Sequence, residues 1–157
     1  MMVSIDVEDQ AWLALADLQN LARDAVNAAL TAAINPHGSV EVSLVFTDDL
    51  SVAQLNAEWR SRDNPTNVLS FPSPGNMPIP EGEPRPLGDI VLAYGVTARE
   101  AGEQGKTLRD HTVHLIVHGM LHLLGHDHEN DVEAEAMEQL EAEILKGLGI
   151  SDPYERH

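Results

Sequence analysis

The chain has 157 residues, so a single domain over residues 1–157 is expected rather than two. Hydrophobic residues make up 43% of the chain and charged residues 22%, which excludes global disorder. There is no cysteine, so disulfides and zinc–thiolate sites are excluded and any metal must be held by His, Asp or Glu. No apolar run is long enough to cross a membrane, and the start of the sequence is acidic rather than basic. We therefore expect a cytoplasmic protein with no membrane partner.

The acidic residues are concentrated at the two ends of the chain. The formal net charge is -17, which argues against DNA and other partners that require a basic surface. Residues 1–59 hold 1 basic and 9 acidic residues, residues 60–128 hold 6 and 8, and residues 129–157 hold 2 and 9. The middle third is therefore nearly neutral, and it is where an anionic ligand would meet least repulsion.

In the first third of the chain, a helical pattern is followed by a strand pattern. Residues 10–33 place apolar side chains at helical spacing, and Pro36 and Gly38 end that helix. Apolar residues alternate with polar ones over residues 40–46, which predicts a strand. Thr47 and Asp48 can then cap a helix that carries Leu50, Leu55 and Trp59.

Strands and helices alternate in the remainder of the chain. A strand is expected at residues 68–71 and another at residues 87–94. Six of the nine prolines fall within residues 72–86, which predicts an exposed loop between them. Helices are expected at residues 96–103, 107–124 and 131–147, the last with Met137, Leu140, Ile144 and Leu148 facing the core. This order predicts an α+β fold in which helices pack on one small mixed sheet.

Six of the eight histidines lie between positions 111 and 128. His118 and His122 are four residues apart, so a helix places both imidazoles on one face, close enough to bind one ion. Gly125 follows, and a glycine there can end the helix in a left-handed conformation and let His128 return to the same ion. Three neutral imidazoles leave a fourth position open, which is typical of catalytic zinc. We expect Zn²⁺, although such a site also accepts Ni²⁺ or another divalent ion.

The other polar residues of this cluster are not expected to bind the metal ion. His114 is expected near the site without binding the ion, and no special function is expected of His111 or His126. Asp127 is either solvent-exposed or orients one imidazole through its second nitrogen.

The spacing H-x-x-x-H-x-x-G-x-x-H is that of the metzincin peptidases, which place a catalytic glutamate directly after the first histidine. Here that position is Gly119, so a peptidase mechanism lacks its proton carrier. Cleavage of a phosphodiester needs instead the neutralisation of charge on phosphoryl oxygens, which a metal and an arginine can provide. An amide or peptide hydrolase remains the alternative among enzymes.

Four ordered motifs resemble the YbeY family of ribosomal RNA maturation factors. They are Leu55-Asn56 to Trp59-Arg60, Asp63 to Pro72, Leu87-Gly88-Asp89-Ile90 and the histidine motif, within residues 40–147. The resemblance implies a metalloprotease-like, zincin-type α+β fold. It also implies a zinc-dependent, single-strand-specific endoribonuclease that acts in maturation of the 3′ end of 16S ribosomal RNA and in ribosome quality control.

By this similarity, His118, His122 and His128 are expected to bind zinc, and Arg60 to be the functionally required arginine beside His118 in catalysis. The expected partners are single-stranded RNA and the small ribosomal subunit or its associated proteins. Attack on the phosphate by water and attack by the RNA 2′-hydroxyl both remain open. A non-catalytic ribosome-assembly factor, in which the metal has only a structural role, is the second alternative.

Overall fold

The computed structural model describes residues 2–32, 39–60, 65–74, 78–126 and 130–153, with the side chain of Arg60 outside the description. The elements in chain order are β1 (Met2–Val7), η1 (Gln10–Ala14), α1 (Leu18–Ala32), β2 (Val40–Thr47), α2 (Asp49–Arg60), β3 (Val68–Pro72), β4 (Arg85–Ala93), α3 (Tyr94–Gln104), α4 (Leu108–Leu123) and α5 (Asp131–Gly147). Among the described residues, no helix combines the length and apolarity needed to span a membrane.

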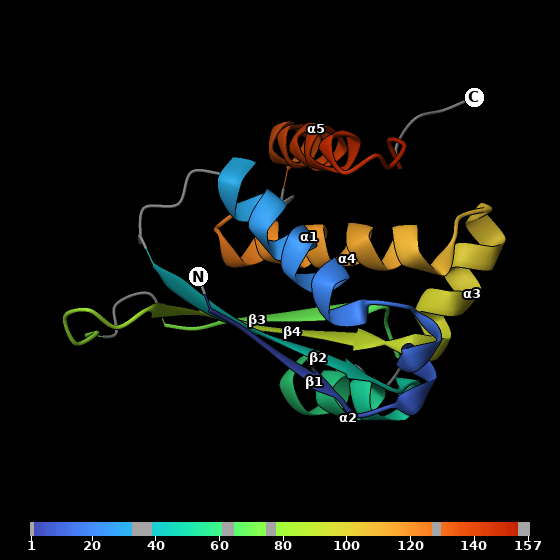
Figure 1. The fold of residues 1–157 in the computed structure, drawn as a ribbon, viewed down its shortest axis with the longest axis horizontal. Coiled ribbons are helices and arrows are strands. Elements are labelled where there is room, and N and C mark those ends of the chain that lie inside the picture. The colour runs from blue at the N-terminus through green and yellow to red at the C-terminus, as the bar shows by residue number, and fades with distance from the viewer. Residues whose placement is uncertain (1, 33–38, 61–64, 75–77, 127–129, 154–157) are drawn as a thin grey trace.

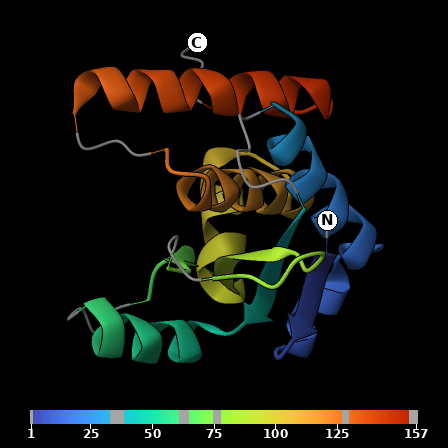
Figure 2. The ribbon, with the colours of Figure 1, turned by 90° about the vertical axis from the view of Figure 1, so that its left-hand side faces the viewer.

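The four strands form one mixed sheet in the order β1-β2-β4-β3. The strands β1, β2 and β4 run parallel, and β3 pairs antiparallel with β4 at the sheet edge. Helices α1 and α4 cover one face, α2 covers the other, and α5 lies over α4 as a further layer (Figures 1 and 2). The expected α+β fold with a mixed sheet is confirmed.

The larger core lies between the sheet and α1, α4 and α5. The alternation predicted for β2 is observed, since Val40, Val42, Leu44 and Phe46 are buried. A smaller cluster lies on the α2 side of the sheet and includes Val52, Leu69, Val91, Ala93 and Val96. Asp48 caps α2 as expected, because its Oδ1 accepts a hydrogen bond from the backbone N–H of Ser51 at 2.7 Å.

The continuous helix expected at residues 10–33 is wrong. The chain forms η1, turns at Asp17 with φ of 56°, and only then enters α1. Trp12 explains the break: its ring is fully buried and its Nε1–H donates to the carbonyl of Thr47 at 2.9 Å. Edge-to-face contacts with Phe46 and Tyr94 hold the ring at the end of the sheet. These contacts of Trp12 hold η1, a short 3-10 helix, apart from α1.

The strand β1 was not predicted. It pairs with β2 along its whole length, from Met2 opposite Glu41 to Val7 opposite Phe46. Most of its side chains are at least partly exposed, because it is an edge strand, so its apolar pattern is weak. Its existence therefore depends on pairing with a distant segment.

The loop expected at residues 72–86 ends earlier than predicted, because β4 begins at Arg85. Leu87 is an extra residue in β4, since Pro86 pairs with Glu41 and Gly88 with Val42. Gly88 has a φ of +143° and lies opposite Pro72 of β3. A Cβ atom at this position would lie 2.2 Å from the carbonyl oxygen of Phe71. Glycine is thus required for β3 to pair closely with β4.

The substitution Gly88→Ala is expected to lower the free energy of unfolding by about 3 kcal/mol or more, because strain and overpacking add. Urea denaturation measures this loss. Gly82→Ala is the matched control, since Gly82 also has a positive φ, of +85°, but has open space around it. The control should lose only about 1 to 2 kcal/mol. Equal losses in the two variants would contradict the role of Gly88 in strand pairing.

Candidate metal centre

The histidine-bearing segment forms the helix α4, as predicted. The helix begins after Thr107, whose Oγ1 accepts a hydrogen bond from the backbone N–H of Asp110 at 3.0 Å. One side of α4 is apolar and lies against the sheet and α1, with Ile116, Val117, Met120 and Leu121 fully buried. The imidazoles of four residues line a groove at its other side: His111, His114, His118 and His122.

The structure brings His118 and His122 together. Their Nε2 atoms are 3.1 Å apart and their ring centroids 4.7 Å apart. Two ligands that each lie about 2.0 to 2.1 Å from one ion at the tetrahedral angle are about 3.3 Å from each other. The two nitrogens are therefore placed nearly as a shared ion requires.

Gly125 ends the helix in the predicted manner. Its φ is +97°, its backbone N–H donates to the carbonyl of His122 at 3.1 Å, and that of His126 donates to Leu121 at 2.9 Å. These two bonds are the Schellman pattern by which a helix ends and the chain changes direction. His128 and Asp127 lie outside the described residues, as does the side chain of Arg60, so their expected roles stay predictions.

The clearest residue that sequence reasoning missed is Glu141 of α5. It is fully buried, and its Oε1 hydrogen-bonds with Nδ1 of His118. Its Oε2 lies 3.2 Å from Nε2 of His114. The apolar stripe predicted for α5 is present, with Met137 and Ile144 buried, but Glu141 lies on the same face. A signal was available, since a carboxylate four residues after Met137 interrupts that stripe.

His114 lies near the site, as expected, and contacts the carboxylate of Glu141. Its side chain is 13% exposed, and its ring centroid is 6.4 Å from that of His118.

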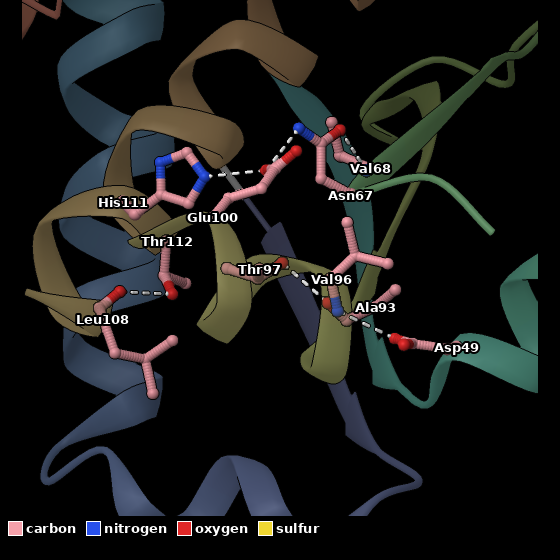
Figure 3. Close-up of polar contacts among 10 residues, drawn as sticks. All are labelled: Asp49, Asn67, Val68, Ala93, Val96, Thr97, Glu100, Leu108, His111 and Thr112. Carbon is pink, nitrogen blue, oxygen red and sulfur yellow. Dashed lines mark hydrogen bonds and ion pairs between the residues drawn. The ribbon is translucent and has the colours of Figure 1, made fainter. Parts of the chain in front are cut away.

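His111, which is buried, also contacts a carboxylate. His111 Nε2 lies 2.9 Å from Oε1 of Glu100 in α3, and the same oxygen accepts a hydrogen bond from Nδ2 of Asn67 at 2.9 Å (Figure 3). This network joins β3, α3 and α4, so His111 has a structural place in the core, which is consistent with the expectation that it has no special function. Burial lowers the pKa of His111, and the hydrogen bond and charge of Glu100 partly oppose that effect.

The start of α3 is fixed by a carboxylate from another helix. Its N-terminal cap, Ala93, has no side chain that can accept a hydrogen bond. Instead Oδ1 of Asp49, at the start of α2, accepts from the backbone N–H of Val96 at 3.0 Å (Figure 3). A Cβ atom at Gly95 would lie 2.4 Å from Oδ2 of Asp49, so the glycine makes room for this contact. The cap helps to set the position of α3, which carries Glu100 to the groove.

The groove has a volume of about 860 Å³ and lies between β3, α3 and α4. His118 and His122 lie in its wall, together with the network of Glu100 and His111. His126 and Lys106 also line it. The groove can therefore hold an extended polar ligand beside the two histidines.

Gly119 marks the closest approach of α4 to the sheet. A Cβ atom there would lie 3.1 Å from Oγ of Ser70 and 3.2 Å from Cδ1 and Cγ2 of Ile90. The position therefore faces β3 and β4, and a side chain there would press against Ser70 and Ile90. A residue after His118 thus points toward the sheet and not freely into the groove.

Comparison with known proteins places the chain in a family. The family model described as Endoribonuclease YbeY matches residues 4–149. The chain belongs to the YbeY family. Curated relatives named Endoribonuclease YbeY include one from Chelativorans sp., 52% identical over 143 residues, which are 91% of this chain and 86% of the relative. Another, from Dinoroseobacter shibae, is 51% identical over an alignment of 164 positions that covers 98% of this chain and 90% of the relative.

A solved structure supports the YbeY fold. The solution structure of TM1509 from Thermotoga maritima matches with a TM-score of 0.57 and 24% identity, over 99% of this chain and 100% of that one. The family resemblance inferred from the four sequence motifs is thereby confirmed, and so is the fold expected of a YbeY protein.

The buried position of His111 in this YbeY protein predicts its titration. Its imidazole should titrate below pH 6.5, the ordinary value, because burial disfavours the charged ring. In the variant Glu100→Gln the midpoint should fall further, since the carboxylate that favours protonation is removed. Histidine C–H resonances followed by NMR across pH measure both midpoints.

The same shift has a consequence for stability. The folded protein binds this proton less tightly than the unfolded chain, so protonation favours unfolding. The contribution of His111 is therefore complete above about pH 6.5 and is lost as the pH falls through its folded pKa. A midpoint above 6.5, or an upward shift in Glu100→Gln, would contradict this account.

Proposed function

We propose that the chain is a zinc-dependent endoribonuclease that cleaves single-stranded RNA, and that it acts in maturation of the 3′ end of 16S ribosomal RNA and in ribosome quality control. The observation that carries the proposal is the pair of Nε2 atoms of His118 and His122, 3.1 Å apart in the wall of a large groove. Membership of a family described as Endoribonuclease YbeY supports the same activity.

The donor set favours zinc. His118 and His122 offer neutral imidazole nitrogens, and His128, three residues after the turn at Gly125, is proposed as the third ligand. Three imidazoles suit Zn²⁺ and other borderline cations such as Ni²⁺, whereas Mg²⁺ and Ca²⁺ require oxygen donors. When bound, zinc would supply Lewis acidity toward water and toward phosphoryl oxygen.

The residues of the chain itself then have separate tasks. His118 would bind the metal at the wall of the groove. Arg60 is proposed to bind phosphoryl oxygens, because the paired N–H donors of its guanidinium group match their geometry. Lys106 adds a positive charge to the lining of the groove. Both cations belong to the nearly neutral middle third of the sequence, where phosphate meets the least repulsion.

The overall charge of -17 bears on how the substrate arrives. Few basic residues are available to release counterions from RNA, so affinity for free RNA is expected to be weak. We propose that the small ribosomal subunit or an associated protein presents the single-stranded segment. An amide hydrolase is disfavoured because Gly119 occupies the position of the required glutamate and packs closely against the sheet.

Zinc content and RNA cleavage test the metal together. The purified protein should hold one zinc ion per chain, and each of the variants His118→Ala, His122→Ala and His128→Ala should lose it. Cleavage of single-stranded RNA should fall by about 1000-fold in each variant and on chelation, because the charge that stabilises the transition state is removed. His126→Ala is the control within the same motif and should keep its zinc. Stoichiometric zinc in all three variants would refute the metal site, and zinc without metal-dependent cleavage would favour a structural role.

The role of Arg60 is tested by measuring RNA cleavage and folding stability separately in the variant Arg60→Ala. In Arg60→Ala, kcat/KM for single-stranded RNA should fall by about 100-fold or more, because one charge-assisted pair of bonds to the phosphate is lost. The free energy of unfolding should change far less, by no more than about 0.5 kcal/mol, because the role proposed for Arg60 is toward the substrate. Arg109→Ala replaces another, exposed arginine of the middle third and should leave cleavage nearly unchanged. Equal kcat/KM values in the two variants would remove Arg60 from the mechanism.

A further inference from the structure

Glu141 is a carboxyl group with no solvent exposure in a helix that otherwise buries apolar side chains. A buried carboxylate is costly unless hydrogen bonds compensate its lost hydration. Here the compensation comes from two imidazoles of α4, His114 and His118. The helix α5 lies directly over α4, so this contact spans two layers of the fold (Figure 2). A leucine would bury at this position without such a requirement, which makes the carboxylate a feature that needs a reason.

The reason lies in the two nitrogens of His118. An ionised carboxylate only accepts hydrogen bonds, so with Glu141 ionised the facing Nδ1 of His118 carries the proton of the neutral ring. The other nitrogen, Nε2, then keeps its lone pair. This is the atom that lies 3.1 Å from Nε2 of His122. The contact with Glu141 thus fixes both the tautomer and the rotation of the ring in the state that a metal ligand needs.

From this geometry we infer that Glu141 is a positioning residue of the metal centre, which acts through His118 and not by binding the ion itself. The inference rests on the proposed metal site and adds a residue from α5 to it. His114 completes the arrangement, because its Nε2 lies 3.2 Å from the second oxygen, Oε2, and holds the carboxylate in place. His114 therefore belongs to the support of the site and not to its ligands.

A second histidine–glutamate pair, His111 and Glu100, can serve as a control. His111 lies two turns before His118 on α4, is buried where His118 is partly exposed, and bonds through Nε2 to Glu100 of α3 at 2.9 Å. That ring uses its Nε2 for the carboxylate, so it does not offer this nitrogen to an ion. The substitution Glu100→Gln therefore removes a carboxylate from a histidine of the same helix without touching the proposed ligands.

The experiment compares Glu141→Gln with Glu100→Gln. Zinc affinity is measured by competition with a chromophoric chelator, and folding is followed by circular dichroism and thermal unfolding of the metal-free proteins. The glutamine keeps the shape of Glu141 but replaces one acceptor by an N–H₂ donor, which conflicts with one imidazole N–H. We expect zinc affinity to fall by about 10- to 100-fold in Glu141→Gln. The affinity of Glu100→Gln should stay within about twofold of wild type, since its histidine is not a ligand.

A second measurement is independent of any variant. Long-range ¹H–¹⁵N correlations of the imidazoles in the metal-free wild-type protein report which nitrogen of His118 carries the proton. The expected result is the Nδ1–H tautomer. The Nε2–H tautomer would overturn the inference, and this readout stands even if Glu141→Gln does not fold.

The outcomes also separate this inference from the proposed function. If wild-type protein binds zinc but Glu141→Gln loses less than threefold in affinity, or Glu100→Gln loses as much as Glu141→Gln, Glu141 has no positioning role. If wild-type protein binds no zinc, the proposed metal function fails, and the tautomer of His118 alone decides whether Glu141 orients that ring.

Discussion

The close packing of α4 on the sheet at Gly119 is the constraint on which the candidate site depends. The absence of a Cβ atom lets the helix backbone approach Ser70 and Ile90, so that the neighbouring turns of α4 are held against β3 and β4. His118 precedes this contact directly and His122 follows it by less than one turn. The imidazoles are therefore carried on a helix whose distance from the groove wall is set by backbone packing. A larger residue would move the helix away from the sheet and the two histidines with it.

Two carboxylates from different helices hold the row of histidines on α4. Glu100 comes from α3 and contacts His111, while Glu141 comes from α5 and contacts His114 and His118. Glu141 is fully buried and contacts two imidazoles, whereas Glu100 is partly exposed and accepts from Asn67 as well as contacting His111. The result is mutual: the histidines satisfy the acids, and the acids restrict the tautomer and rotation of the rings. The helix α5 therefore contributes to the proposed metal site without binding the ion, whereas α3 supports the neighbouring turn of α4 at His111.

The proposed function reconciles a strongly acidic protein with an anionic substrate. Most of the acidic residues lie in the first and last segments of the chain, while the groove is lined largely by residues between 67 and 126. Over long distances the acidic protein and the anionic RNA attract each other weakly or repel each other. Recognition therefore has to depend on local contacts and on presentation by a partner. An enzyme built in this way would act on few RNA sites, which suits a role in maturation more than one in general degradation.

Local patterns in the sequence were sufficient for most of the elements and for part of the site. The strand β2, the helices α2 to α5, the cap at Asp48 and the turn at Gly125 were predicted because each depends on neighbouring residues alone. The meeting of His118 and His122 followed from helical spacing for the same reason. The break before α1 was missed because it depends on the burial of Trp12 against Phe46 and Tyr94. The edge strand β1 was missed because it depends on pairing with β2.

The sequence by itself determined the helix, the histidine pair and the glycine turn, since each needs only residues within one or two turns of chain. Only the tertiary structure decided that Glu141 meets His118 and that Glu100 meets His111. These contacts join separate helices, and no spacing rule encodes which faces of two helices come together. The packing of α3 and α5 against α4 selects the partners, because a carboxylate removed from water is stable only where hydrogen-bond donors lie within reach.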